Sequence, residues 1–85
     1  MRTFEYTIKD AVGIHARPAG MLVNEVKNCG AKVTVSCNGK SADAGKLMAL
    51  MGLGIKKGME VEVTVEGEQE EVAFAQIKEF FVKNL

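Results

Sequence analysis

The sequence predicts an α+β fold, an open-faced β-sandwich in which a four-stranded antiparallel sheet is covered on one face by three helices (βαββαβα). Apolar and polar residues alternate with the period of a half-buried strand in residues 3–8, 32–37 and 59–66. An Asn-Gly pair after the second of these stretches predicts a hairpin and therefore a fourth strand. Strands with a single apolar face are typical of a sheet that is solvated on one side and covered by helices on the other.

The first strand is expected over residues 3–8, and a helix is expected to follow it. Pro18 lies just inside the expected start of this helix and Gly30 just past its end, which is the asymmetry typical of helix termini. The apolar stripe of the helix consists of Ala19, Leu22, Val23 and Val26.

The hairpin is expected to turn at Asn38-Gly39 and to return through residues 40–43. A two-residue turn at this point places Val35 opposite Ala42, so that small apolar groups share the inner face. Residues 46–51 are then expected to form a short helix.

The last two elements have the clearest patterns. Valines alternate with glutamates and a threonine in residues 60–66, as in a strand with one buried face. In the C-terminal helix, glutamates near the start and Lys83 near the end match the helix dipole. The apolar stripe of this helix consists of Ala73, Phe74, Ile77, Phe80 and Phe81.

Length and composition predict one small domain that spans residues 1–85. A domain of 85 residues buries a modest core, so we expect its function to reside on the surface. Hydrophobic residues make up 47% and charged residues 26% of the chain, and 11 basic residues balance 11 acidic ones. With zero net charge, neither a nucleic acid nor an anionic membrane would be attracted over distance, and neither is expected as a partner.

Nothing in the sequence predicts secretion or insertion into a membrane. The N-terminal residues lack the apolar stretch of a signal peptide, and no apolar run approaches the roughly 20 residues of a membrane helix. The two cysteines, Cys29 and Cys37, have no CxxC spacing and are expected to be reduced, partly buried apolar residues. We therefore expect a cytoplasmic protein.

The single histidine, His15, directly precedes the first predicted helix in the stretch Gly13-Ile14-His15-Ala16-Arg17-Pro18-Ala19. Unpaired N–H groups and the positive end of the helix dipole make such a position a site for anions. The same field disfavours the imidazolium by up to about 2 kcal/mol, which keeps the ring neutral and nucleophilic. Arg17 adds a guanidinium group suited to phosphate oxygens.

These residue types indicate phosphoryl transfer through His15. A neutral imidazole nitrogen can attack phosphorus, and Arg17 together with the backbone amides of Ala16 and Arg17 would then stabilise the phosphoimidazole. No second histidine, suitably placed base or cluster of metal ligands is visible, so we expect a transfer intermediate without metal or cofactor rather than a hydrolase. The residues alone leave open a structural alternative, in which His15 caps the helix and Arg17 is merely solvated.

The stretch around His15 resembles the phosphorylation-site signature of the HPr family, the histidine-containing phosphocarrier proteins of the bacterial phosphoenolpyruvate:sugar phosphotransferase system. The resemblance covers the whole chain, including the element order, the Asn38-Gly39 turn and the apolar segment 47–55. It implies that His15 carries the phosphate on Nδ1 with Arg17 as its partner. It also implies that enzyme I supplies the phosphate and that enzyme IIA domains of the enzymes II receive it, so the chain is a carrier rather than an enzyme.

A docking surface for these partners is expected on both of the first two helices. The short helix has apolar residues on more than one face but can bury only one of them, so some must be exposed. We expect Leu50 and Leu53 in the core, and flexible methionines suit a carrier that fits several partners. The expected docking residues of this helix are Leu47, Met48 and Met51.

Family resemblance adds Gly20, Asn24 and Lys27 of the first helix to the docking surface. A solvated helix face explains Asn24 and Lys27 equally well. Gly20 departs from the family pattern, because the position usually holds a larger side chain.

Lys46 is the clearest departure from the family. The position usually holds a serine that an ATP-dependent kinase phosphorylates in many Gram-positive bacteria, and lysine cannot accept that phosphate by the same chemistry. The chain is then either a sugar-system carrier from a lineage without the kinase or a paralogue that serves a regulatory phosphorelay.

Two other classes of function remain as alternatives. A binding module would regulate another protein without carrying phosphate, but it has no evident need for both His15 and Arg17. A soft-metal chaperone would need clustered ligands, whereas the five methionines, two cysteines and one histidine are scattered. We expect a monomer that meets enzyme I, enzyme IIA domains and, in the regulatory alternative, regulatory proteins.

Overall fold

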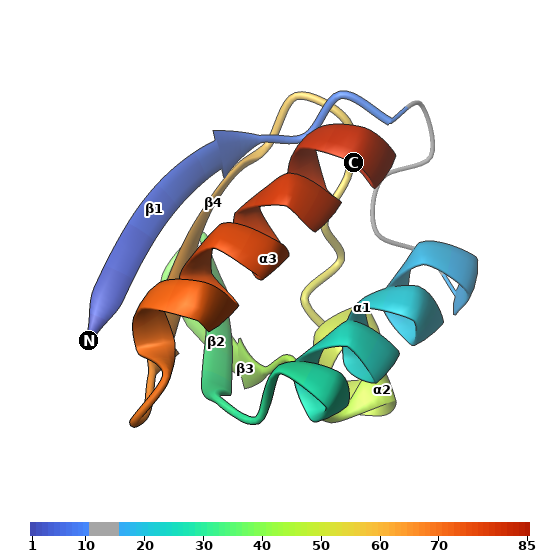
Figure 1. The fold of residues 1–85 in the computed structure, drawn as a ribbon. Coiled ribbons are helices and arrows are strands. Elements are labelled where there is room, and N and C mark those ends of the chain that lie inside the picture. Colours follow the sequence, from blue (N-terminus) through green and yellow to red (C-terminus); the bar gives the residue numbers. More distant parts are fainter. Residues whose placement is uncertain (11–15) are drawn as a thin grey trace.

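The computed structural model describes residues 1–10 and 16–85 and has the predicted order of elements (Figure 1). The elements are β1 (Arg2–Thr7), α1 (Ala16–Cys29), β2 (Lys32–Cys37), β3 (Lys40–Asp43), α2 (Leu47–Met51), β4 (Glu60–Glu66) and α3 (Glu70–Asn84).

The four strands form one antiparallel sheet in the order β1-β4-β2-β3. β4 is therefore an inner strand, although it is the last to be synthesised. One row of paired residues crosses the whole sheet: Val63 lies between Phe4 and Val35, and Val35 lies opposite Ala42. All four side chains of this row are buried, so they define the inner face.

The helices cover this inner face, as Figure 1 shows, and α1 packs beside both α2 and α3. Phe81 of α3 is fully buried and contacts three other rings edge-on, with centroid distances of 5.6 Å to Phe4, 5.7 Å to Tyr6 and 6.4 Å to Phe80. Such edge-to-face contacts add to the stabilisation that comes from burying the rings. The predicted open-faced sandwich is confirmed.

The opposite face of the sheet is solvated. Glu5 and Glu62 are exposed and lie opposite each other in the register, and the hydroxyls of Ser36 and Ser41 share a hydrogen bond of 2.9 Å there. Apolar and polar residues therefore alternate along these strands because only one face contacts helices.

Both predicted ends of α1 and the predicted hairpin are confirmed. Some element boundaries differ from the prediction by one residue. Gly30 follows α1 with a φ of 71°, a left-handed conformation common after helices. The short helix begins at Leu47 rather than Lys46, because Lys46 has extended backbone (φ −123°, ψ 112°) and precedes the helix as its N-cap. Within residues 1–10 and 16–85, no helix is long and apolar enough to cross a membrane.

The two cysteines are free thiols, as expected, with Cys37 buried and Cys29 partly buried. Cys29 donates its S–H to the carbonyl oxygen of Val26, with an S···O distance of 3.2 Å. Both side chains therefore contribute to packing.

The hairpin turn generates a stability prediction. Asn38 and Gly39 have φ angles of 52° and 80°, the combination of a type I′ turn. We expect Gly39→Ala to lower the free energy of unfolding by about 1 kcal/mol or more, because a side chain is strained at this φ. Lys40→Ala, at an exposed neighbouring position, is the control. Denaturant titration of both variants measures the difference, and equal midpoints would contradict this account of the turn.

Candidate functional site

The candidate phosphate acceptor, His15, lies outside the described residues, together with residues 11–14. The structure describes the residues on both sides of this segment. On one side, the backbone N–H groups of Lys9 and Asp10 donate to the carbonyl oxygen of Leu85, at 2.5 and 2.8 Å. On the other side, α1 begins at Ala16, directly after the histidine. The end of α3 therefore holds the chain where it enters the histidine segment.

The beginning of α1 fits the electrostatic argument made from the sequence. No acidic residue occurs in the first turn of this 14-residue helix, so no side chain of that turn offsets its positive end. Pro18 lacks an N–H group, whereas Ala16 and Arg17 carry N–H groups at the helix start, where no intrahelical acceptor is available. These amides are the ones predicted to bind phosphate.

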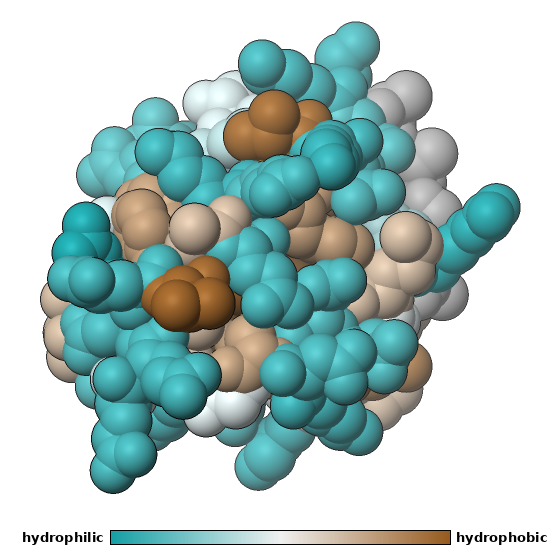
Figure 2. Space-filling model, in the orientation of Figure 1, coloured by the Kyte–Doolittle hydropathy of each residue, from teal (hydrophilic) through white to brown (hydrophobic). Residues whose placement is uncertain are grey.

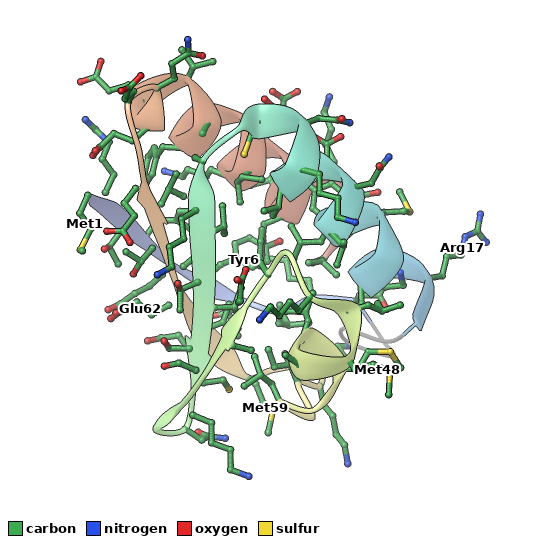
Figure 3. All side chains as sticks on the ribbon, turned by 90° about the horizontal axis from the view of Figure 1, so that it is seen from below. Met1, Tyr6, Arg17, Met48, Met59 and Glu62 are labelled. Carbon is green, nitrogen blue, oxygen red and sulfur yellow. The ribbon has the colours of Figure 1, made fainter. Side chains whose placement is uncertain are left out.

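Arg17 is exposed, and Figure 3 shows its side chain extending away from the start of α1. It forms no ion pair with any residue of the described ranges. A hollow of about 320 Å³ beside it is lined by Asp10, Arg17, Pro18, Met21 and Asn84. Residue Arg17 therefore borders a hollow between the end of α3 and the start of α1, while its side chain extends into solvent.

The three docking residues predicted on α1 lie together. A second hollow, of about 480 Å³, follows this helix and is lined by Arg17, Gly20, Met21, Val23, Asn24 and Lys27. These positions are spaced three and four residues apart, which places them along one side of a helix. The structure thus joins Gly20, Asn24 and Lys27 to Arg17 on one continuous surface.

Within the described part of the chain, nothing in the structure requires a glycine at position 20. It lies inside α1, its φ is not positive, and a Cβ atom built on it would meet nothing within 4 Å. A glycine inside a helix costs about 1 kcal/mol of stability relative to alanine. Neither backbone conformation nor internal packing accounts for that cost.

The exposure expected for α2 is confirmed. Leu50 is fully buried and Leu53 packs against the core, whereas Met48 is 79% exposed. Leu47 and Met51 are 39% and 36% exposed. Figure 3 places Met48 on the same side of the molecule as Arg17, and α1 and α2 are neighbours. The role of these side chains in docking stays a prediction.

The helical side of the molecule, in the orientation of Figure 2, is mostly hydrophilic. Hydrophobic residues appear there as separate patches rather than as one broad surface. Isolated patches of this kind fit brief contacts with partners better than a permanent interface, which is larger and more apolar.

Lys46 provides no cap for α2, because its side chain makes no hydrogen bond to the first turn. The approach to the helix is instead held by Asp43, whose carboxylate accepts from the N–H of Gly45 at 2.8 Å and whose carbonyl accepts from Lys46 at 3.0 Å. This turn orders the chain before α2, but the first turn of the helix has no side-chain cap of the kind that a serine would supply.

The resolved pKa shifts belong to α3 and lie outside the hollows that Arg17 lines. A hydrogen bond from Lys83 to Glu79, with an N···O distance of 2.6 Å, lowers the pKa of Glu79 and raises the pKa of Lys83. The pKa of Glu70 is lowered by its hydrogen bond with the amino group of Met1. The Glu79–Lys83 pair is exposed, and the Met1–Glu70 pair lies at the surface with Glu70 partly buried, so both pairs stabilise the fold little.

Two contributors to the site were missed from the sequence. Met21 is 43% exposed and lines both hollows, and its position four residues after Arg17 was the signal that could have identified it. Asn84 lines the hollow beside Arg17 from the far end of the chain. No local pattern could have identified Asn84, because its position depends on the packing of α3 beside α1. Among the described residues, no cluster of histidine, cysteine or acidic side chains could hold a metal ion.

Comparisons with known proteins add independent information. A family model described as "PTS HPr component phosphorylation site" matches residues 2–83. The phosphocarrier protein HPr of Lysinibacillus sphaericus is 38% identical over 74 residues, which cover 87% of this chain and 84% of the relative. A multiphosphoryl transfer protein of Salmonella typhimurium is 38% identical over 76 residues, which cover 86% of this chain but 20% of that longer protein. A solved histidine-containing phosphocarrier protein of Mycoplasma superposes with a TM-score of 0.91 at 30% identity, covering 96% of this chain and 93% of that one.

The two faces of α2 generate a stability prediction. We expect Leu50→Ala to lower the free energy of unfolding by about 2–5 kcal/mol, because it removes a fully buried side chain. Met48→Ala, on the same short helix, should change it by less than about 0.5 kcal/mol, because the thioether is exposed. Chemical denaturation measures both, and a large loss in Met48→Ala would show that this residue belongs to the core.

Proposed function

The chain belongs to the HPr family of phosphocarrier proteins, and we propose that it accepts a phosphoryl group from phosphorylated enzyme I on His15 and passes it to enzyme IIA domains. The observation that carries this proposal is the match of a family model for the phosphorylation site to residues 2–83, with His15 directly before the helix that begins at Ala16. The relationship to a multiphosphoryl transfer protein supports a place in the same transfer system.

The chemistry follows from a neutral imidazole at the start of α1. The lone pair of Nδ1 of His15 attacks phosphorus, and the N–P bond forms as the bond from phosphorus to the donor breaks. The guanidinium of Arg17 and the N–H groups of Ala16 and Arg17 then bind the phosphoryl oxygens. Transfer onward is the reverse displacement, in which the next acceptor attacks phosphorus and the electron pair returns to Nδ1. The chain is therefore a carrier without independent turnover.

Docking involves both helices beside Arg17. Gly20, Asn24 and Lys27 of α1 meet the partner, and Leu47, Met48 and Met51 of α2 supply exposed apolar contacts. The chain acts as a single HPr-like domain over residues 1–85, as a monomer in the cytoplasm, with enzyme I and enzyme IIA domains as successive partners.

Lys46 favours a second candidate function. Because lysine cannot accept phosphate as serine does, control by phosphorylation of this position is absent here. A paralogue in a regulatory phosphorelay, or one that acts as a binding module, would also lack that control.

We expect the chain to gain one phosphoryl group when it is incubated with phosphoenolpyruvate and a catalytic amount of enzyme I. Intact mass should show a single acid-labile group in the native chain and none in His15→Ala. Arg17→Ala should slow the reaction on the order of 100-fold, because it removes a charged donor to the transferring phosphoryl group. Arg2→Ala is the matched control, since it removes the chain's other arginine, on β1.

Several results would contradict the proposal. A group that persists in acid, or one that remains in His15→Ala, would place the phosphate on another residue. No gain at all, with a known carrier phosphorylated in the same tube, would favour the binding module or a different donor.

A further inference from the structure

Two exposed methionines lie on the side of the molecule that carries Arg17, and we propose that these two, Met21 and Met48, form a peroxide-sensitive switch of phosphoryl exchange. Oxidation of both thioethers to sulfoxides weakens the exchange with protein partners and leaves the fold intact. This inference deepens the proposed function and rests on it, because the switch controls the transfer of phosphate through His15.

The exposure of the side chain differs among the five methionines. Met48 is 79% exposed and Met21 is 43% exposed, so a peroxide reaches both thioethers from solvent. Met51 of α2, at 36%, is less accessible than either. Met59 packs against the core, and its Sδ atom accepts a hydrogen bond of 3.2 Å from the N–H of Lys56. We therefore expect Met48 and Met21 to be oxidised before Met59.

Position separates Met21 and Met48 from Met1, the other strongly exposed methionine. Met21 lines both hollows beside Arg17, and Met48 belongs to α2, which packs beside α1. Met1 is 75% exposed, but Figure 3 shows it on the opposite side of the molecule from Arg17 and Met48. Met1 is therefore an internal control, because a peroxide oxidises it far from the surface proposed for exchange.

The two thiols are less accessible than these thioethers. Cys37 is buried, and Cys29 is partly buried with its S–H group donated to the carbonyl oxygen of Val26. Oxidation of a cysteine depends on its exposure to the oxidant. A low dose of peroxide is therefore expected to act on Met21 and Met48 before it acts on either cysteine.

The oxidation transfers one oxygen atom from hydrogen peroxide to sulfur. A lone pair of the thioether sulfur attacks one peroxide oxygen, and the S–O bond forms as the O–O bond breaks. The departing hydroxide takes the proton from the transferred oxygen and leaves as water. Sulfur is thereby oxidised by two electrons, hydrogen peroxide is reduced to water, and an apolar side chain becomes a polar sulfoxide.

A sulfoxide at either position changes the surface rather than the core. When a partner covers the side chain, the sulfoxide oxygen loses its bound water, and burying a polar oxygen without a hydrogen bond is unfavourable. In the free protein both side chains are exposed to solvent, so the same oxygen atoms cost the fold little. We therefore expect weaker exchange with unchanged stability.

The test treats the full chain with hydrogen peroxide and locates the sulfoxides by peptide mass mapping. Transfer from phosphorylated enzyme I is then measured with this chain as the varied substrate. We expect sulfoxides at Met21 and Met48, a rise of KM of about tenfold, kcat within about twofold and an unchanged denaturation midpoint. The two methionine sulfoxide reductases, one for each epimer, should restore KM, whereas their reductant alone should not.

Leucine variants locate the effect, since leucine has a similar volume and no sulfur to oxidise. The KM of each variant after treatment is compared with the KM of the same variant before treatment. We expect the double variant Met21→Leu/Met48→Leu to show no rise, although Met1 is oxidised in it. Met59→Leu, the matched control, should keep the rise of about tenfold.

The remaining outcomes separate this inference from the function on which it rests. If the untreated chain accepts phosphate, sulfoxides at Met21 and Met48 with an unchanged KM would overturn the switch alone. A rise of KM that persists in the double variant, or one accompanied by a lower denaturation midpoint, would overturn it as well. An untreated chain that accepts no phosphate would overturn the proposed function and this inference with it.

Discussion

The pairing of β4 with both β1 and β2 is the constraint on which the rest of the structure depends. Val63 lies between Phe4 and Val35 in the sheet, so one buried row joins residues from the beginning, middle and end of the chain. α3 follows β4 directly and packs against β1, where Phe81 meets Phe4 and Tyr6. The same packing brings Leu85 to the backbone of Lys9 and Asp10. α3 therefore holds the backbone just before the histidine segment, and the position of α3 itself depends on the inner strand β4.

The proposed function uses the surface at the start of α1 and beside α2. The described residues contain no cluster of metal ligands, and the two hollows that Arg17 lines are open grooves at the surface. A carrier must be released by its donor before it can meet its acceptor. An open surface of this kind permits such successive contacts. Separate hydrophobic patches in a hydrophilic face fit such brief contacts (Figure 2). The positive end of α1, whose first turn carries no acidic side chain, is the feature that joins this surface to the proposed phosphate chemistry.

Much of the fold could be predicted from local signals. Asn38-Gly39 determined the turn and the pairing of Val35 with Ala42, because a type I′ turn fixes the register of two short strands. The buried faces of α1 and α3 followed from their apolar stripes. The strand order β1-β4-β2-β3 could not be predicted in this way, because it depends on pairing between residues about 60 positions apart. The position of Asn84 beside Arg17 likewise could not be predicted from a local pattern, because it depends on how the helices pack. The same holds for the open space above Gly20.

The central claim, that His15 carries the phosphoryl group on Nδ1, is tested most directly by nitrogen and phosphorus NMR. The chain has a single histidine, so labelling histidine with ¹⁵N gives the two ring nitrogens of one imidazole. After reaction with phosphoenolpyruvate and enzyme I, we expect a ³¹P–¹⁵N coupling to Nδ1 and none to Nε2. Coupling to Nε2, or phosphorylation with no change at either ring nitrogen, would contradict the account.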